Sequence, residues 1–150
     1  MAAKFPLQSL LDLSNLRLDE AARLLGQLVD GELQATERLD LLIQYRDEYH
    51  VRFLDAARQG LAPDQWRNYQ SFLERLDSAI CQARELLAQS RQRKAAGQKE
   101  WLDRRGRVKA FDTLAHRHQA RAEYAERRLE QKTQDEHSAR KHQTKNQDPK

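Results

Sequence analysis

Apolar side chains recur along the first third of the chain at alternating spacings of three and four residues. Starting from Leu11, this spacing reaches 14 positions, of which 11 are apolar or aromatic. The intervening positions are mostly polar or charged, as in the heptad repeat of a coiled coil. The pattern predicts a helix over about residues 7–58. Its positions are Leu11, Ser14, Leu18, Ala21, Leu25, Leu28, Glu32, Ala35, Leu39, Leu42, Arg46, Tyr49, Phe53 and Ala56.

A second run of the same pattern begins at Trp66 and keeps its phase to Leu129. Fourteen of its 19 positions are apolar or aromatic, which predicts one helix over about residues 65–136. The weak stretch lies between Ser90 and Gly97, where a bend or local fraying is expected because glycine disfavours helix. The positions are Trp66, Tyr69, Leu73, Leu76, Ile80, Ala83, Leu87, Ser90, Lys94, Gly97, Trp101, Arg104, Val108, Phe111, Ala115, His118, Ala122, Ala125 and Leu129. We call both sets of positions the seam.

A turn is predicted over residues 59–64, between the two patterns. Gly60 suits the position just after a helix, and Pro63 suits the first turn of the next helix. The expected fold is therefore all-α, a long antiparallel two-helix coiled-coil hairpin in which residue i faces roughly residue 122 − i. Leu42 then lies near Ile80. Residues after about 118 find no partner in the first helix, and residues 137–150 are expected to form a disordered basic tail.

Composition and charge agree with a long-helix protein. Charged residues make up 33% of the chain and hydrophobic residues 39%, with only 5 Gly and 3 Pro. Residues 1–75 hold 9 Lys+Arg and 12 Asp+Glu, a net charge of −3, whereas residues 76–150 hold 18 and 11, a net charge of +7. Opposite charge on the two arms favours antiparallel pairing within one chain.

Signals for catalysis, metal binding and membrane insertion are missing from the sequence. No apolar run approaches the roughly 20 residues that cross a bilayer, and the N-terminus does not resemble a signal peptide. The histidines do not stand with acids or cysteines at metal-ligand spacing, and no glycine-rich phosphate loop is present. The single cysteine, Cys81, is expected to be a small apolar filler in a reducing cytoplasm. We expect no enzyme activity, no cofactor and no metal.

Two features predict binding surfaces. Aromatic residues concentrate near the turn, and Tyr45 and Phe72 stand one step off the seam, so they either widen it or form a docking patch. A basic stretch between Arg91 and Lys109 is either a solvated face paired with the acidic arm, a site for an acidic protein, or a nucleic-acid site.

The chain resembles the FliJ family of flagellar export proteins over nearly its whole length, to about residue 136. The resemblance is carried by residues 21–26 (AARLLG), residues 42–49 (LIQYRDEY), Gly60, residues 66–72 (WRNYQSF), Leu76 with Ala79 and Ile80, and residues 128–132 (RLEQK). A coiled-coil pattern alone is unspecific, whereas the segment at residues 66–72 is much more distinctive.

The resemblance implies a cytoplasmic coiled-coil stalk of the flagellar type III export apparatus, peripheral at the inner membrane at the flagellar base and not inserted in it. Its implied partners are the hexameric export ATPase FliI, whose assembly it promotes, the export gate protein FlhA, and export chaperones, with no nucleic acid. The implied gate-binding residues are Leu42, Tyr45, Tyr49, Phe72, Leu76 and Ala79.

The end of the hairpin that carries the chain termini is expected to enter the ATPase ring. The residues expected to do so are Leu11, Leu18, Phe111, Ala122, Ala125 and Leu129. The family pattern has Gln where this chain has Arg38, and His where it has Ala83, which leaves the edge of the gate-binding surface open. Alternative functions are a general export chaperone or scaffold, and a nucleic-acid-binding helical rod.

Overall fold

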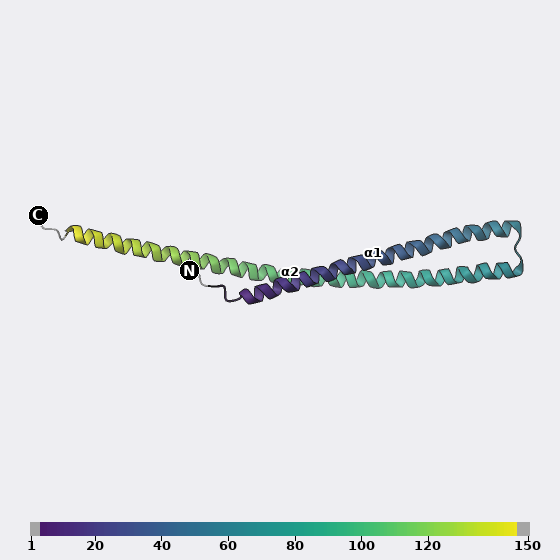
Figure 1. The fold of residues 1–150 in the computed structure, drawn as a ribbon, viewed down its shortest axis with the longest axis horizontal. Helices are drawn as coiled ribbons and strands as arrows, with labels where there is room; N and C mark the ends of the chain where they lie inside the picture. The colour runs from purple at the N-terminus through teal and green to yellow at the C-terminus, as the bar shows by residue number, and fades with distance from the viewer. Residues whose placement is uncertain (1–3, 147–150) are drawn as a thin grey trace. The chain divides into compact units, whose positions relative to one another are not determined.

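A computed structural model describes residues 4–146 of the protein. Over this range the chain forms two helices and no strand: α1 spans Gln8–Gln59 and α2 spans Pro63–Asn146 (Figure 1). The two helices pack against each other as a hairpin, which confirms the predicted all-α fold. Both helices begin and end within two residues of the predicted bounds, except at the C-terminal end of α2.

The turn between the helices is closed by local backbone geometry. Gly60 adopts a φ of 96°, and its N–H donates to the carbonyl oxygen of Ala57 at 3.2 Å, as in a glycine-terminated helix. Pro63 then begins α2, where its missing N–H costs no helical hydrogen bond. The Gln65 side chain accepts from the Ala62 N–H at 3.4 Å, which is half of a capping box. The chain therefore reverses within residues 60–62.

The hairpin divides into two compact units, and the division falls within both helices. The turn unit comprises residues 19–103, and the terminal unit comprises residues 1–18 and 104–150, of which 4–18 and 104–146 are described.

The core of the turn unit lies where the seam is most apolar. Leu39, Ile80, Ala83 and Leu87 form a buried cluster, and Ile80 is only 2% exposed. Leu42 packs against this cluster together with Ala35 and Ile43, which agrees with the predicted facing of Leu42 and Ile80. Burial of these side chains is the main force that holds α1 against α2 here.

The predicted seam matches the observed burial closely. All 14 seam positions of α1 are buried or half-buried, as are 16 of the 19 in α2. The exceptions are Trp66, Ala125 and Leu129, which are exposed. Trp66 packs against Phe53, with ring centroids 5.1 Å apart, and remains 43% exposed.

A glycine allows close approach of the helices in the turn unit. Gly97 is buried, and a Cβ built there would lie 2.6 Å from Cδ1 of Leu28. The leucine side chains of α1 thus occupy the space that a larger residue would need. α2 runs without interruption through Gly97 and Gly106, so the expected local fraying between residues 90 and 97 is not observed.

An ion-pair cluster replaces apolar packing in the neighbouring layer of the seam. Glu32 lies 2.6 Å from Nζ of Lys94 and 3.6 Å from Nε of Arg91. The hydrogen-bonding contact with Lys94 lowers the pKa of the Glu32 carboxyl, although partial burial opposes the shift, and the charges of Lys94 and Arg91 lower it further. This cluster pairs two residues of the basic stretch, Arg91 and Lys94, with one acidic residue of α1.

The terminal unit has a smaller core, built from Leu11 and Val108, each 7% exposed. Phe5 packs against the His118 ring, with centroids 5.6 Å apart. This ring contact lies at the end of the interface between the N-terminal segment and α2. From residue 123 to residue 146 every position of α2 is exposed. The packing of the first arm on α2 therefore ends close to the position that the 122 − i relation predicted.

The C-terminal segment differs from the prediction of a disordered tail over residues 137–150. α2 continues through residues 137–146, and residues 147–150 lie outside the described range. An existing helix extends at little cost, because the nucleation step has already occurred. Ala139, Arg140 and Lys141 are good helix formers, and no Gly or Pro intervenes before Pro149. Helix propensity thus suffices here without apolar periodicity.

Candidate binding surfaces

The first candidate surface, which we call the aromatic surface, lies in the turn unit. α1 contributes residues at spacings of three and four, and α2 contributes residues at spacings of four and three, so each set shares one helix face. The surface consists of Leu42, Tyr45, Tyr49, Phe72, Leu76 and Ala79.

The aromatic surface combines a fixed base with an exposed rim. Tyr49 is half-buried and packs against Phe72 and Tyr69, with ring centroids 4.2 Å and 5.2 Å apart. Leu76 is buried, whereas Tyr45 is 51% exposed and Phe72 is 40% exposed. The seam is therefore widened by Phe72 on Tyr49, and the outward sides of Tyr45 and Phe72 remain available to a partner.

The second candidate surface, which we call the terminal surface, lies in the terminal unit. Leu11 is buried, and Leu18, Phe111 and Ala122 are half-buried, so the packing of α1 on α2 already covers most of these side chains. Ala125 and Leu129 are exposed, and Leu129 is the most exposed large hydrophobic residue of the described range, at 65%. The accessible part of the terminal surface is thus the stretch of α2 beyond residue 122.

A groove of about 270 Å³ in the terminal unit was not predicted from the sequence. The seam pattern misses it because most of its lining residues stand beside the seam and not on it. Leu10 and Arg17 each precede a seam residue of α1, and Arg107 precedes one of α2. The sequence feature that could have indicated this groove is the recurrence of large side chains at positions directly before seam residues. The lining residues are Leu10, Leu13, Ser14, Arg17, Arg104, Arg107 and Phe111.

A comparable groove of about 310 Å³ lies in the turn unit, on the same flank of the seam. Arg38 and Leu86 precede seam residues of α1 and α2, and Leu86 is 49% exposed. Arg38 of α1 and Ala83 of α2 both line this groove. Its full lining is Gly31, Gln34, Ala35, Arg38, Ala83, Leu86 and Ser90.

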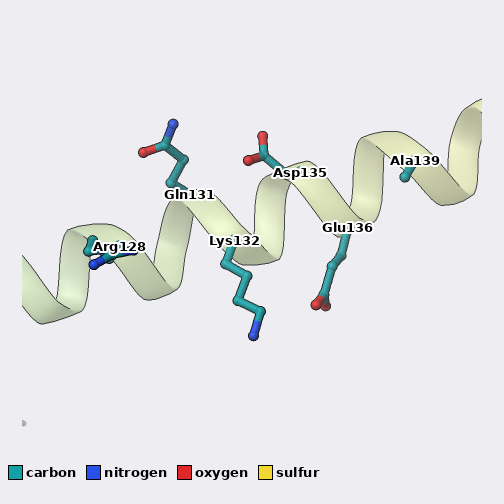
Figure 2. A pocket seen from close by; sticks show the side chains of 6 residues that line it. All are labelled: Arg128, Gln131, Lys132, Asp135, Glu136 and Ala139. Carbon is teal, nitrogen blue, oxygen red and sulfur yellow. The ribbon is translucent and has the colours of Figure 1, made fainter.

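A further hollow runs along α2 in the terminal unit, and Figure 2 shows the six side chains that line it: Arg128, Gln131, Lys132, Asp135, Glu136 and Ala139. All six come from one helix, and Gln131 and Asp135 point to the opposite side from Lys132 and Glu136. Such a surface encloses no ligand, because a binding pocket needs walls from more than one element. We therefore assign no site to it.

Side chains that could ligate a metal ion do not cluster in residues 4–146. This part of the chain contains no group of three or more His, Cys, Asp or Glu residues that could hold a metal ion. Cys81 is exposed, which corrects the expectation that it is a buried filler. No helix of the described range is both long enough and apolar enough to cross a membrane.

Comparison with known proteins identifies relatives over almost the entire chain. The sequence profile of the family described as "Flagellar FliJ protein" matches residues 3–147. A flagellar FliJ protein of Salmonella typhi is 39% identical over 140 residues, which cover 93% of this chain and 95% of the relative. A flagellar FliJ protein of Escherichia coli (strain K12) is 37% identical over 140 residues, with the same coverage.

Proposed function

The chain belongs to the FliJ family of flagellar proteins, and we propose that it serves flagellar protein export as a coiled-coil stalk with two partners. The terminal surface binds within the ring of the export ATPase FliI and promotes its hexamerisation, and the aromatic surface binds the export gate protein FlhA. The stalk also escorts export chaperones. It acts in the cytoplasm at the flagellar base, peripheral to the inner membrane.

The observation that carries this proposal is the match to flagellar FliJ proteins along the whole hairpin, turn included. The packing supports a binding role for the aromatic surface, because the ring of Tyr49 holds the ring of Phe72 in place before a partner arrives, while Tyr45 is 51% exposed beside it in sequence register. A preorganised aromatic anchor loses little side-chain freedom on binding and contributes strongly to affinity.

Leu129 and Ala125 support a binding role for the terminal surface. They continue the seam on a part of α2 that α1 does not cover, so within residues 4–146 neither side chain is buried by a partner helix. Leu11 and Leu76 would act indirectly, since their side chains are buried and hold the exposed residues in position.

The proposal is tested by adding the purified protein to the purified export ATPase and measuring ATP hydrolysis and hexamer formation. We expect both to increase, and we expect deletion of residues 119–150 to abolish the increase. Circular dichroism controls for the fold, because the deletion retains His118 and its contact with Phe5. Undiminished stimulation by the shortened chain would refute the assignment of the terminal surface, and no stimulation by the full chain would refute the ATPase role.

A further inference from the structure

The groove in the terminal unit combines an apolar floor with unpaired positive charge. Leu10 and Leu13 are 45% and 43% exposed, and half-buried Phe111 lies between the helices. The guanidinium groups of Arg17 and Arg107 line the same groove, and neither has an acidic partner among residues 4–146. Apolar surface and unpaired arginines in one groove are each more stable when a complementary partner covers them.

Charge in the rest of the terminal unit points to an acidic partner. Residues 1–18 and 104–150 together hold 15 Lys+Arg and 8 Asp+Glu, a net charge of +7. The remaining residues, 19–103, hold 12 and 15, a net charge of −3. The groove therefore lies in the strongly basic unit, where an anionic protein surface is attracted and a second copy of the same unit is repelled.

The spacing of the groove residues specifies the shape of the partner. Leu10 and Arg17, which both line the groove, are seven residues apart on α1. On α2, Leu114 is 41% exposed and lies seven residues after Arg107, outside the groove lining. Because the helices are antiparallel, a leucine layer is followed by an arginine layer two helical turns away, about 10 Å along the groove. A helix laid between α1 and α2 matches this geometry with one face of its own.

We propose that this groove binds an acidic amphipathic helix of the protein that contacts the terminal unit. The helix places apolar side chains at positions i and i+3 over Leu10 and Leu13, and an acidic side chain near i+7 between Arg17 and Arg107. The identification of that protein as the export ATPase rests on the proposed function. The groove chemistry itself is independent of that identification.

The test uses a charge reversal in the full chain, Arg17→Glu with Arg107→Glu, and a matched control, Arg67→Glu with Arg84→Glu, which makes the same change at exposed positions of the turn unit. A third variant, Leu10→Ser with Leu13→Ser, removes the apolar floor. Circular dichroism is used to check that each variant keeps the helicity of the unmodified chain. Binding to the purified export ATPase is measured by biolayer interferometry at about 50 and 300 mM salt.

We expect the groove charge reversal to weaken ATPase binding on the order of tenfold or more at low salt and to flatten its salt dependence. The leucine variant weakens binding at both salt concentrations, and the control binds like the unmodified chain. If the charge reversal binds the ATPase normally, the groove proposal is overturned while the ATPase role stands. If the charge reversal weakens ATPase binding but the leucine variant binds like the unmodified chain, the groove is an anion site and the helix assignment fails.

A second probe separates failure of the groove proposal from failure of the proposed function. It is a synthetic helical peptide with leucines at i and i+3 and glutamates around i+7, compared with a peptide in which lysines replace the glutamates. If the ATPase binds none of the chains, retention of the glutamate peptide by the unmodified chain but not by Arg17→Glu with Arg107→Glu still supports the groove proposal. Equal retention of both peptides, or of neither, overturns it.

Discussion

The Glu32 cluster illustrates how a single charged residue is accommodated in a coiled-coil seam. Its carboxylate is held between the Lys94 ammonium and the Arg91 guanidinium, so charge pairing takes the place of apolar contact. Polar residues at seam positions commonly lower stability but fix the register of the two helices. Since Lys94 is itself a seam residue, an alternative register would leave both charges without partners.

This pairing predicts a specific pH dependence of stability. Because the pKa of Glu32 is lowered in the folded chain, its contribution is present above the ordinary carboxyl value of 4.5 and is lost as the pH falls through the lowered value. Urea unfolding should show the unmodified chain more stable than Glu32→Gln at neutral pH, with the difference shrinking on acidification. The same comparison for exposed Glu37→Gln should show little difference, and a Glu32 effect that grows towards acid pH would contradict the account.

Adding a methyl group should have different effects on stability at the two glycines of α2. Gly106 has no atom within 4 Å of a built Cβ, so Gly106→Ala should stabilise the hairpin by up to about 1 kcal/mol through helix propensity. At Gly97 the same methyl group meets Cδ1 of Leu28, which must move. Denaturant unfolding should therefore show a smaller gain, or a loss, for Gly97→Ala. Equal stabilisation at both positions would mean that the helices do not pack closely at Gly97.

At the scale of whole elements, the heptad pattern predicted more of the helices than of the binding surfaces. It identified the seam from Leu11 to Ala122 because apolar periodicity directly reflects which face of a helix is buried. The pattern did not reveal that Leu11 and Leu76 are too buried to contact a partner, since spacing indicates a face and not the remaining exposure. It also missed the grooves, which depend on the positions beside the seam in both helices at once.

At the C-terminal end of α2 the heptad pattern predicted too little helix. Absence of apolar periodicity after residue 136 indicated disorder, yet the helix continues to Asn146. Periodicity reports burial against a partner, whereas helix formation in an exposed extension depends on propensity and on the helix that precedes it. The two signals separate where a helix extends without packing.

Substitution by alanine should have opposite effects on stability at a glycine of the turn and at a glycine within α1. Gly60 has a positive φ, which strains any residue with a Cβ, so Gly60→Ala should destabilise the hairpin by about 1 kcal/mol. Gly26 lies within α1 with open space around it, so Gly26→Ala should instead stabilise the hairpin by a similar amount. Thermal unfolding followed by circular dichroism measures both. A neutral Gly60→Ala would indicate that the turn does not need this conformation.

For the molecule as a whole, the division into two units corresponds to a division of binding chemistry. The turn unit carries the aromatic surface and a net charge of −3, whereas the terminal unit carries exposed Leu129, an arginine-lined groove and a net charge of +7. Under the proposed function, the aromatic surface selects its partner by aromatic packing and the terminal surface selects its partner by opposite charge. The proposed stalk function requires this separation.

The most direct test measures the binding of two variants to both proposed partners. Tyr45→Ala removes an exposed aromatic side chain of the turn unit, and Leu129→Ser removes an exposed apolar side chain of the terminal unit. In titrations with the purified gate protein and the purified export ATPase, Tyr45→Ala should weaken only gate binding, and Leu129→Ser should weaken only ATPase binding, each by about tenfold. Weakening of both partners by one variant, or of neither by both, would contradict the two-surface account.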